Sequence, residues 1–569
     1  MSPEYIVGVN IGFHDSSACL LRHGSVRIMV EQERVSRRKR AIAENPADAV
    51  RSCLAAEGIT SNDVDALAIG WDFRDTPIGR TKRFSDQVLW ESLLPDRRRP
   101  SSAVRWVPHH LAHAASGFYS SGTSDAAIIV VDGAGERTAS TIARGSALGI
   151  DVVREWPIAQ SLGFFFAAAT RWAGFGDWGA GKLMGLAAYG RPRDGLPVRA
   201  TADGYEIVVD GRPLELSQTE GRAVRGPMLS QFPDYEKALL GSFAAMFPYA
   251  ERDVAAGEGA IAYADFAASA QEQIEQALLG LATAARTAVD VPTLVLTGGV
   301  AMNCSMIGAL VRSGVFEHVY VPPVPTDVGV ALGAALVVAE EQQPFRPVVI
   351  DHPYWSVDIT GEQARIVVDA AGLPSATLAD DELIRVVAAA IAEGRIVGWS
   401  RGRGEIGERA LGSRSILADP RSRQTLQRLN TLKGREMWRP VAPSVLSEHL
   451  DEVMETPVGH PARFMLAAGT VRRHLRTAIP AVTHVDGTAR PQLVDRATNP
   501  LYWGLIERFR VLTGIPLVVN TSFNLAGEPI VSSAADAMST FRRSEDMDLL
   551  VLDNMLVART PDALAACLA

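Results

Sequence analysis

The feature that most constrains the fold of this chain is a repeated alternation of short apolar strands with amphipathic helices. Two strongly apolar runs, residues 126–131 and 293–297, are followed directly by Asp-Gly and by Gly-Gly. Residues 301–314 and 327–341 then place apolar side chains at the spacing of a helix. Strands and helices in alternation, with glycine turns at the strand ends, are typical of α/β layers whose ligands bind beyond those ends. We therefore expect an α/β protein.

The chain opens with three strand-like runs within residues 5–34, joined by one tight loop and one hairpin turn. Further helices are expected at 45–58, 109–122, 271–290, 380–394, 499–514 and 532–544, and further strands at 65–71, 395–400, 515–524 and 549–559. A proline-bearing passage around residues 342–352 separates two such patterns. This predicts two domains, residues 1–345 and 346–569.

Length and charge exclude some classes of protein. A chain of 569 residues, 47% of them hydrophobic, can bury at least two cores. Its 56 basic and 65 acidic side chains give a net charge of -9, which leaves no global positive field for nucleic acid and weakly favours cationic small substrates. The four cysteines form no C-x-x-C pair, and no signal peptide or membrane-spanning run is visible. We expect a cytoplasmic protein without a nucleic-acid or membrane partner, and the sequence does not indicate its oligomeric state.

A short polar turn between the first two strands is the first candidate site. Gly12 and Asp15 lie where backbone N–H groups can face a phosphate. In the same turn, a neutral His14 imidazole can deprotonate an alcohol. The same residue types also make ordinary hairpin turns, so a purely structural turn stays open.

Two histidines and two aspartates form a candidate metal site. His109 and His113 are four residues apart in an expected helix, which places both imidazoles on one face. Asp132 follows an apolar strand, and Asp327 begins a helix after a loop, so both carboxylates can face the same cleft. This donor set suits Fe(II), Mn(II) or Zn(II). His110 can replace His109 as the ligand, and spacing alone does not decide between them.

Glycine-rich turns at other strand ends let the backbone approach a flat or anionic ligand closely. Such turns are also common without a ligand, and a flexible surface loop is the alternative for the stretch 179–190. The candidate residues in these turns are Gly133, Gly135, Lys182, Gly298, Gly299 and Asn303.

Positive side chains gather in two places. In the basic run of residues 34–40, we interpret Lys39 or a neighbouring arginine as a phosphate contact, with a solvated strand end as the alternative. The second half is rich in arginine, and several converging guanidinium groups repel one another unless they share an anion. The polar residues at 520, 522 and 524 alternate and so point to one side of a strand. Together these predict a polyanion pocket from Arg409, Arg414, Lys433, Arg439, Arg490, Asn520, Ser522 and Asn524.

The motifs GFHDSSACL, HHLAHA, VVDGAGE, GKLMGLAAYG, LTGGVAMNC and TDVGVALGAAL, followed by RALGSRSILADPR, KGREMWRPVAPS and VVNTSFN, cover nearly the whole chain in order. With these motifs in this order, the chain resembles the NodU-type carbamoyltransferases, which include nodulation-factor enzymes and antibiotic-tailoring enzymes. The first domain is similar to the threonylcarbamoyl-transfer ATPase of the actin/sugar-kinase (ASKHA) superfold, and the second is similar to the YrdC proteins. One departure is GLAAYG where the family commonly has GLAPYG, which removes a turn-fixing proline.

This resemblance implies a two-step reaction. Carbamoyl phosphate and ATP, with Mg²⁺, would react in the second domain to give carbamoyl-adenylate, with Lys433, Arg439, Arg490 and Ser522 holding the oxygens. Arg409 or Arg414 would neutralise the developing charge. In the first domain the metal site, expected to hold Fe(II), would polarise the carbamoyl group, and His14 would activate the hydroxyl of a small-molecule acceptor such as an aminoglycoside.

Three other functions remain to be compared. A sugar-kinase-like phosphotransferase needs only the first domain and leaves the arginine-rich half without a role. The net negative charge of the chain and the lack of an added RNA-binding module argue against a tRNA threonylcarbamoyl-modifying enzyme. A non-catalytic nucleotide-binding scaffold predicts no turnover.

Overall fold

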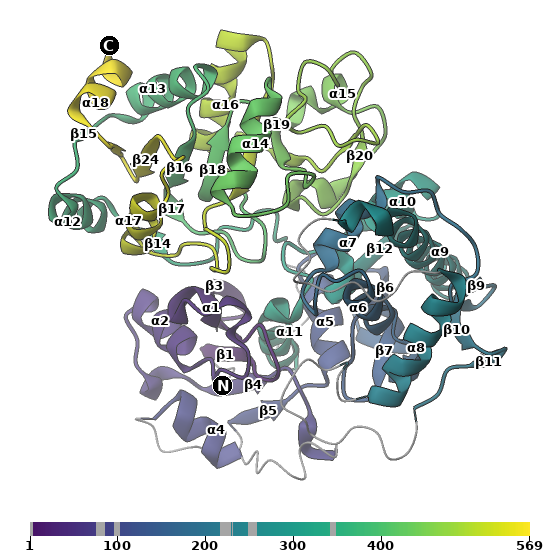
Figure 1. Ribbon diagram of the computed structural model, residues 1–569. Coiled ribbons are helices and arrows are strands. Elements are labelled where there is room, and N and C mark those ends of the chain that lie inside the picture. The colour runs from purple at the N-terminus through teal and green to yellow at the C-terminus, as the bar shows by residue number, and fades with distance from the viewer. Residues whose placement is uncertain are drawn as a thin grey trace. The chain divides into compact units, whose positions relative to one another are not determined.

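The computed structural model describes residues 4–75, 86–95, 103–216, 229, 232–247, 259–341 and 349–569. The chain forms two compact units (Figure 1). The first contains residues 1–32, 41–350 and 458–461, and the second contains 33–40, 351–457 and 462–569. The predicted boundary between residues 345 and 346 lies outside the described residues, so the limits of the functional domains stay a prediction.

The first unit begins with a five-stranded sheet in the order β3-β2-β1-β4-β5. The first three strands pair antiparallel, whereas β4 and β5 extend the sheet in parallel. Its strands are β1 (Tyr5–Asn10), β2 (Ser17–Arg22), β3 (Ser25–Glu31), β4 (Ala66–Ile69) and β5 (Val104–Trp106). β1 is buried along its whole length because this central strand is covered on both faces.

A second sheet in the same unit repeats this arrangement, in the order β13-β12-β6-β7-β8. Again three antiparallel strands, β6, β7 and β8, are extended in parallel by β12 and β13. The strands are β6 (Ala126–Val131), β7 (Thr138–Ser146), β8 (Gly149–Pro157), β12 (Thr293–Thr297) and β13 (His318–Tyr320). The two sheets are therefore two copies of one topology, and the predicted α/β class is confirmed.

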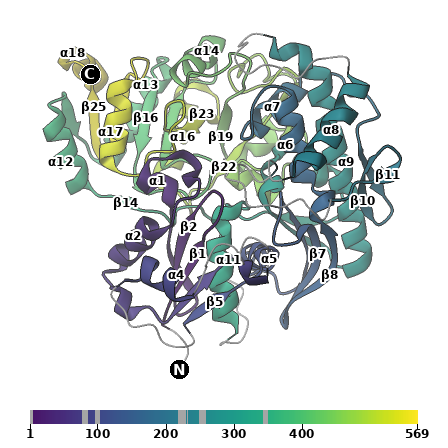
Figure 2. The ribbon, with the colours of Figure 1, turned by 60° about the horizontal axis from the view of Figure 1, so that its bottom comes forward.

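Two buried helices, α5 (His109–Phe118) and α11 (Asp327–Glu340), pack against each other between these sheets (Figures 1 and 2). α11 also packs on β1, and α5 packs on β12 and β6. Glycine permits the close approach: a Cβ atom on Gly8 of β1 would lie 1.9 Å from the carbonyl oxygen of Ala331, and one on Gly333 would lie 1.7 Å from that of Ala112. This tight packing fixes the positions of the polar residues on both helices.

Most of the remaining helices of the first unit gather around the second sheet (Figure 1). The glycine-rich stretch that was weighed as a flexible loop contains a helix, α7, because its leucines pack inward at positions 183 and 186. The remaining elements are α2 (Ala47–Glu57), α4 (Asp86–Leu93), α6 (Leu162–Trp172), α7 (Ala180–Ala187), α8 (Pro233–Met246), α9 (Ala264–Val289), α10 (Cys304–Ser313), β9 (Val198–Thr201), β10 (Gly204–Val209) and β11 (Arg212–Pro213).

The second unit has an eight-stranded mixed sheet in the order β15-β25-β24-β16-β18-β23-β19-β22. The stretch 549–559, expected as one strand, is a hairpin, because Asp553 takes a left-handed turn conformation with φ of 50°. The strands of the sheet are β15 (Ser375–Thr377), β16 (Val397–Ser400), β18 (Arg414–Ala418), β19 (Ala442–Leu446), β22 (Gln492–Val494), β23 (Leu517–Ser522), β24 (Leu549–Leu552) and β25 (Met555–Ala558).

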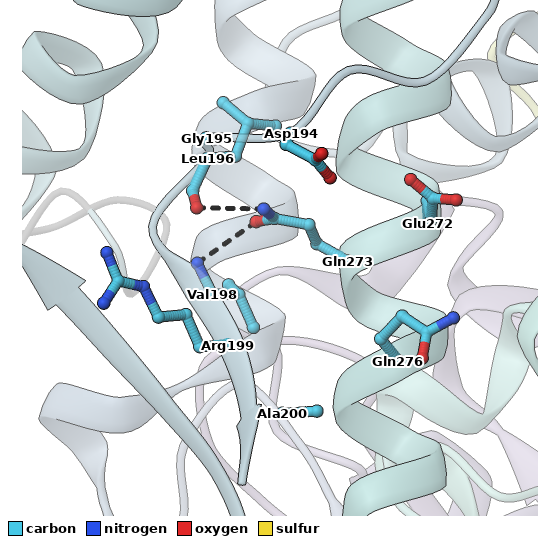
Figure 3. A pocket seen from close by; sticks show the side chains of 9 residues that line it. All are labelled: Asp194, Gly195, Leu196, Val198, Arg199, Ala200, Glu272, Gln273 and Gln276. Carbon is cyan, nitrogen blue, oxygen red and sulfur yellow. Dashed lines mark hydrogen bonds between the residues drawn. The ribbon is translucent and has the colours of Figure 1, made fainter.

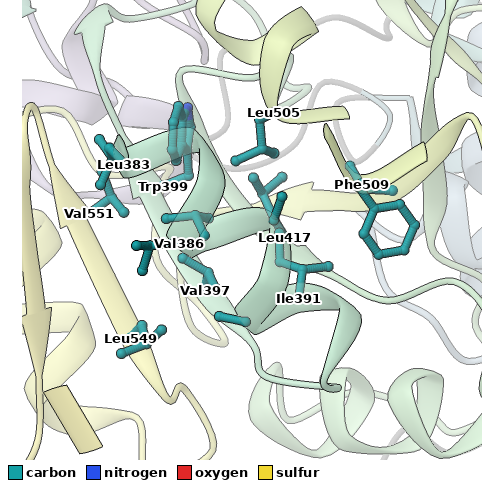
Figure 4. Packing of buried hydrophobic residues seen from close by; sticks show 14 of the residues in the cluster. Leu383, Val386, Ile391, Val397, Trp399, Leu417, Leu505, Phe509, Leu549 and Val551 are labelled. Carbon is teal, nitrogen blue, oxygen red and sulfur yellow. The ribbon is translucent and has the colours of Figure 1, made fainter. Parts of the chain in front are cut away.

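Helices α13 (Asp380–Ala392) and α16 (Pro500–Thr513) pack together on this sheet and close its core. Figure 4 shows Trp399 and Val551 from the sheet among leucine, isoleucine and phenylalanine side chains of these helices. The other elements are α1 (Gln32–Ser36), α12 (Gly361–Ala371), α14 (Arg423–Leu432), α15 (Leu450–Val453), α17 (Ala534–Arg543), α18 (Pro561–Leu568), β14 (Asp358–Ile359), β17 (Gly402–Arg403), β20 (Gly469–Thr470) and β21 (Thr488–Ala489). Among the described helices of both units, none combines the length and the apolar character needed to cross a membrane.

Candidate active site

The predicted metal ligands His109, His113, Asp132 and Asp327 come together in the first unit. One donor atom from each lies within 4.8 Å of the other three. The Nε2 atoms of the two histidines are 3.1 Å apart, and Nε2 of His109 lies 3.3 Å from Oδ2 of Asp132. All four side chains are buried. Two imidazoles and two carboxylates converging in this way are a donor set that fits a divalent transition metal.

Surrounding groups orient the ligand atoms toward this cluster. His109 Nδ1 is 3.1 Å from the carbonyl oxygen of Gly70, which leaves Nε2 facing the other ligands. The indole of Trp71 stacks on the His109 ring with 3.7 Å between centroids. The backbone N–H of Gly299 donates to Oδ1 of Asp132 at 2.9 Å, so that Oδ2 is directed into the cluster. The site therefore has the supporting hydrogen bonds that metal centres use.

The charges of the cluster also favour a cation. Burial alone would lower the pKa of His109, but the carboxylates of Asp327 and Asp132 outweigh it and raise the pKa to about 10. Burial would raise the pKa of Asp327, yet the neighbouring imidazoles hold it well below its usual value. Burial would likewise raise the pKa of Asp132, but its hydrogen bond to His109 and the charges of both imidazoles lower it. Both aspartates are thus ionised, and without a metal His109 keeps its proton.

The alternative ligand His110 points elsewhere. Its Nδ1 lies 2.7 Å from the hydroxyl of Thr141, and it is not among the four converging residues. Burial, together with the nearby His109, lowers its pKa to about 3, so this imidazole is neutral. The structure thus favours His109 over His110 as the ligand.

The predicted base His14 lies in the turn between β1 and β2. Its Nδ1 is 2.9 Å from Oδ2 of Asp15, and its side chain is 27% exposed. Asn10 donates from its side chain to the backbone carbonyls of both turn residues, which fixes the turn, and Asp15 itself has φ of 53°. His14 is one of the groups that lower the pKa of Asp327, so the imidazole lies near the metal cluster. An imidazole held by a carboxylate and still partly exposed can accept a proton from an alcohol.

Several of the glycines predicted to bind a nucleotide allow close backbone packing beside the metal ligands. Gly298 has φ of 94°, and a Cβ atom there would lie 2.2 Å from the carbonyl oxygen of Val131. A Cβ atom on Gly135 would lie 2.8 Å from the His110 ring. Asn303 caps α10 and exchanges hydrogen bonds with Gln271. Nucleotide binding by these residues stays a prediction.

The remaining members of that predicted set lie on neighbouring elements. Gly12 precedes His14 and packs beside the Trp71 indole, and Gly133 packs against the backbone of Gly163. Lys182 projects from α7, with its ammonium 5.8 Å from the centroid of the Phe175 ring.

In the second unit, Lys433 is the centre of a polar cluster at the end of β23. Its ammonium donates to the backbone carbonyl and hydroxyl of Ser522 at 2.6 and 2.9 Å, and to the carbonyl and side-chain oxygens of Asn524. Burial, followed by the charges of Arg435, Lys39 and Arg439, holds the pKa of Lys433 well below its usual value. A site that depresses a lysine pKa in this way gains free energy when an anion enters it.

Arg435 is a member of this cluster that the sequence reasoning missed. Burial and the charges of Arg439 and Arg490 lower its pKa to about 9, and Arg490 also lowers the pKa of Arg439. Lys433, Arg435, Arg439 and Arg490 are therefore linked through their charges in one region of the second unit. The signal was present in the sequence, because the stretch KGRE carries Arg435 two residues after Lys433.

Lys39 also belongs to this cationic cluster, since its charge lowers the pKa of Lys433. The segment 33–40 is part of the second unit although it precedes most of the first unit in the sequence. Arg34 is buried and donates to the carbonyls of Glu405 and Gly407, both at 2.5 Å. Arg37 donates to the carbonyls of Pro529 and Ile530. These contacts hold the segment so that Lys39 acts electrostatically on Lys433.

Two predicted members of the polyanion pocket have structural contacts instead. The buried guanidinium of Arg414 donates to four backbone carbonyls, those of Val357, Arg401, Ser413 and Ser532, so we now assign it a supporting role. Asn520 donates to Ser444 and Gln492, apart from the neighbours of Lys433. β23 ends at Ser522, so the expected alternation covers Asn520 and Ser522 and stops before Asn524. Arg409 lies in the loop between β17 and β18.

The structure also contains a pocket of about 520 Å³ between β9 and α9 in the first unit. Figure 3 shows that Gln273 points across it and hydrogen-bonds with the backbone of Leu196 and Val198. None of the residues predicted as site residues lines this pocket. Its side chains tie β9 to α9, and we assign no chemistry to it.

Comparison with known proteins identifies the family. The model of the carbamoyltransferase N-terminus matches residues 5–77 and 81–336, and that of the carbamoyltransferase C-terminus matches residues 388–559. The chain belongs to the carbamoyltransferase family. It is 33% identical to nodulation protein NolNO of Sinorhizobium fredii, over 97% of this chain and 80% of the relative. Nodulation protein U of the same species is 29% identical, over 92% and 94% of the two chains.

Solved structures give weaker similarities. A 2-hydroxyisocaproyl-CoA dehydratase activator from Clostridium difficile matches 59% of this carbamoyltransferase and 95% of its own chain, at 15% identity and a TM-score of 0.32. Sua5 of P. abyssi matches 31% of this chain and 47% of its own, at 16% identity and a TM-score of 0.24. The family match confirms the predicted enzyme class, a carbamoyltransferase of the NodU/NolO kind.

Proposed function

We propose that this carbamoyltransferase makes carbamoyl-adenylate from carbamoyl phosphate and ATP, and then transfers the carbamoyl group to a hydroxyl of a small molecule. The observation that carries the proposal is the cationic cluster around Lys433. Burial and then the charges of Arg435 and Arg439 lower the pKa of Lys433. Burial lowers the pKa of Arg435 and Arg439 as well, and the charge of Arg490 adds to it. Ser522 and Asn524 supply neutral oxygens at the same place. Such a cluster suits a substrate with several phosphate charges.

The first half-reaction takes place at this cluster. Water cleaves carbamoyl phosphate to carbamate and inorganic phosphate, and a carbamate oxygen then attacks the α-phosphorus of Mg²⁺-bound ATP. The new P–O bond forms as the bond to the β-phosphate breaks, which gives carbamoyl-adenylate and pyrophosphate. Lys433 and Arg439 hold the phosphate oxygens, and Lys39 adds a further positive charge as negative charge develops. Arg409 and Arg490 assist from the neighbouring loops.

The second half-reaction belongs to the first unit. His14 takes the proton of the acceptor hydroxyl, while Asp15 orients the imidazole and stabilises its charged form. The alcohol oxygen attacks the carbamoyl carbon, and AMP leaves with the electrons of the broken C–O bond. His109, His113, Asp132 and Asp327 would hold a divalent metal, proposed to be Fe(II), which supplies Lewis-acid polarisation when bound. Gly12, Gly133 and Gly299 let the backbone approach the adenylate closely.

The proposed acceptor is an antibiotic alcohol of the aminoglycoside type. The net charge of -9 supports a polycationic acceptor, because an acidic protein attracts cations over a distance. Each catalytic cycle replaces one hydroxyl proton of the acceptor with a neutral carbamoyl group and releases that proton.

One assay tests the whole scheme. The protein is incubated with ATP, carbamoyl phosphate and a panel of hydroxylated acceptors, and pyrophosphate, AMP and carbamoylated product are measured. We expect pyrophosphate and AMP in equal amounts with the product. Formation of ADP without a carbamoylated product from any acceptor would show that the proposal is wrong.

Two variants separate the half-reactions. Arg439→Ala is expected to abolish carbamoyl-phosphate-dependent pyrophosphate release, whereas His14→Asn retains that release and loses transfer. Arg510→Ala is the matched arginine control, because Arg510 lies on α16 and pairs with Glu507 outside the cluster. Loss of both steps in both variants would contradict the division into two sites.

A further inference from the structure

The side chain of Trp178 lies beside His14 and is 40% exposed. The indole and imidazole rings meet edge to face, with 5.0 Å between centroids and 80° between planes. A single exposed aromatic residue on a protein surface is ordinary. Trp178, however, contacts the partly exposed imidazole that is proposed to activate an alcohol. This is stronger evidence of a binding site, because an acceptor that reaches His14 also meets the indole ring.

The loop that carries Trp178 is held in place. It connects α6 to α7 and turns at Gly174 and Gly176, which have φ of 72° and 68°. Arg171 at the end of α6 pairs with Asp177 of the loop and with Glu236 of α8. A Cβ atom on Gly179 would lie 2.4 Å from that of Phe175, so the loop closes tightly on itself. These contacts fix the conformation of the loop, and with it the position of Trp178.

We propose that Trp178 forms one wall of the acceptor subsite, on which a saturated sugar-type ring of the acceptor stacks while its hydroxyl reaches His14. The indole is a wide, polarisable face that packs against the C–H groups of such a ring and attracts an attached ammonium group. Fixed aromatic contact also reduces the number of orientations in which the hydroxyl meets the imidazole. This inference rests on the proposed role of His14 as the base.

The test uses the full-length enzyme with three acceptors: methyl β-D-glucopyranoside, methyl 2-amino-2-deoxy-β-D-glucopyranoside and acyclic sorbitol. Trp178→Ala is expected to raise KM for the two pyranosides by about 10-fold or more, the usual size of one lost stacking contact. Trp178→Phe should recover part of this loss. A larger effect on the aminated sugar than on the neutral one would show that attraction of the ammonium group adds to stacking.

Controls separate this inference from the function on which it rests. Leu148→Ala removes another exposed apolar side chain, 97% exposed in the turn between β7 and β8, and should leave KM unchanged. Pyrophosphate release measured on each preparation reports the first half-reaction. Trp178→Ala with an unaltered KM, or a wild-type enzyme that carbamoylates neither pyranoside while using other alcohols, overturns the inference alone. Failure of the wild type to transfer to any alcohol overturns the proposed function.

Discussion

At the scale of single residues, His109 shows how two neighbouring carboxylates prepare a site for a cation. A metal must displace the proton that these carboxylates stabilise on the imidazole, whose pKa they raise to about 10. Below that pKa each bound metal therefore releases about one proton, so affinity rises with pH through the neutral range and levels off near the pKa. We expect calorimetric titration of the metal-free protein with Mn²⁺, in buffers of different ionisation enthalpy, to report this proton.

The matched variant for this experiment is His110→Asn, which changes the neighbouring imidazole that stays neutral. It should keep the proton release, whereas His109→Asn should lose both the proton and most of the affinity. Metal affinity that is independent of pH from about pH 7 to about pH 9 would contradict the assigned ligand set.

Arg435 supports a second prediction at this scale. Its charge is buried among other cations, so its loss weakens the attraction of the cluster for phosphate. Arg435→Gln keeps a hydrogen-bonding side chain and is expected to raise KM for ATP by about 10-fold to 100-fold, the usual effect of one charged contact. The Arg510→Ala enzyme measured in parallel should match the wild type. An unchanged KM would place Arg435 outside the nucleotide site.

At the scale of elements, the turn after β12 joins the second sheet to a metal ligand. A Cβ atom on Gly299 would lie 2.8 Å from Oδ1 of Asp132, the oxygen that its N–H holds. Gly299→Ala must therefore displace that carboxylate and should lower metal affinity by about 10-fold or more, the usual cost of losing an outer-shell contact. Gly181→Ala is the control, since nothing lies within 4 Å of a Cβ atom at that helical position. Equal metal affinity in both variants would rule out this coupling.

The segment 33–40 supports a prediction about stability. Arg34 is 2% exposed and supplies donors to two carbonyl groups of the second unit. Arg34→Met leaves these carbonyls without that donor and should lower the free energy of unfolding by about 2–4 kcal/mol. Arg38→Met, at an exposed position of the same segment, should change it by less than about 0.5 kcal/mol. Denaturant unfolding measures both, and equal stabilities would show that the segment is not anchored by Arg34.

The elements also show what the sequence could reveal. His109, His113, Asp132 and Asp327 were predictable because helix spacing and strand ends determine where these side chains point. The supporting role of Arg414 was not predictable, because three of the carbonyl groups that accept its hydrogen bonds lie 13 to 118 residues away in the sequence. The hairpin at Asp553 was missed because its turn is only two residues long between two apolar runs. The assignment of Lys39 to the second unit depends on long-range packing, which periodicity does not encode.

At the scale of the whole molecule, the proposed reaction requires two sites in one chain to share an unstable intermediate. Carbamoyl-adenylate is a mixed anhydride that water destroys, so release into solvent would waste ATP. If transfer occurs within one chain, a mixture of His14→Asn and Arg439→Ala enzymes should form much less product than the wild type at equal total concentration. Each variant then has one active site that works, so product can form only if the adenylate diffuses from one variant to the other.

The mixing experiment also measures the fate of the adenylate. The His14→Asn enzyme should release pyrophosphate without carbamoylating the acceptor, and the carbamoyl group should appear as ammonia and carbon dioxide. Raising the concentration of Arg439→Ala enzyme tests for capture: product that rises in proportion to that concentration would show free diffusion and contradict transfer within one chain. Product that stays near the background of the separate variants means that the intermediate does not pass from one enzyme molecule to another before water destroys it, which explains why one chain carries both sites.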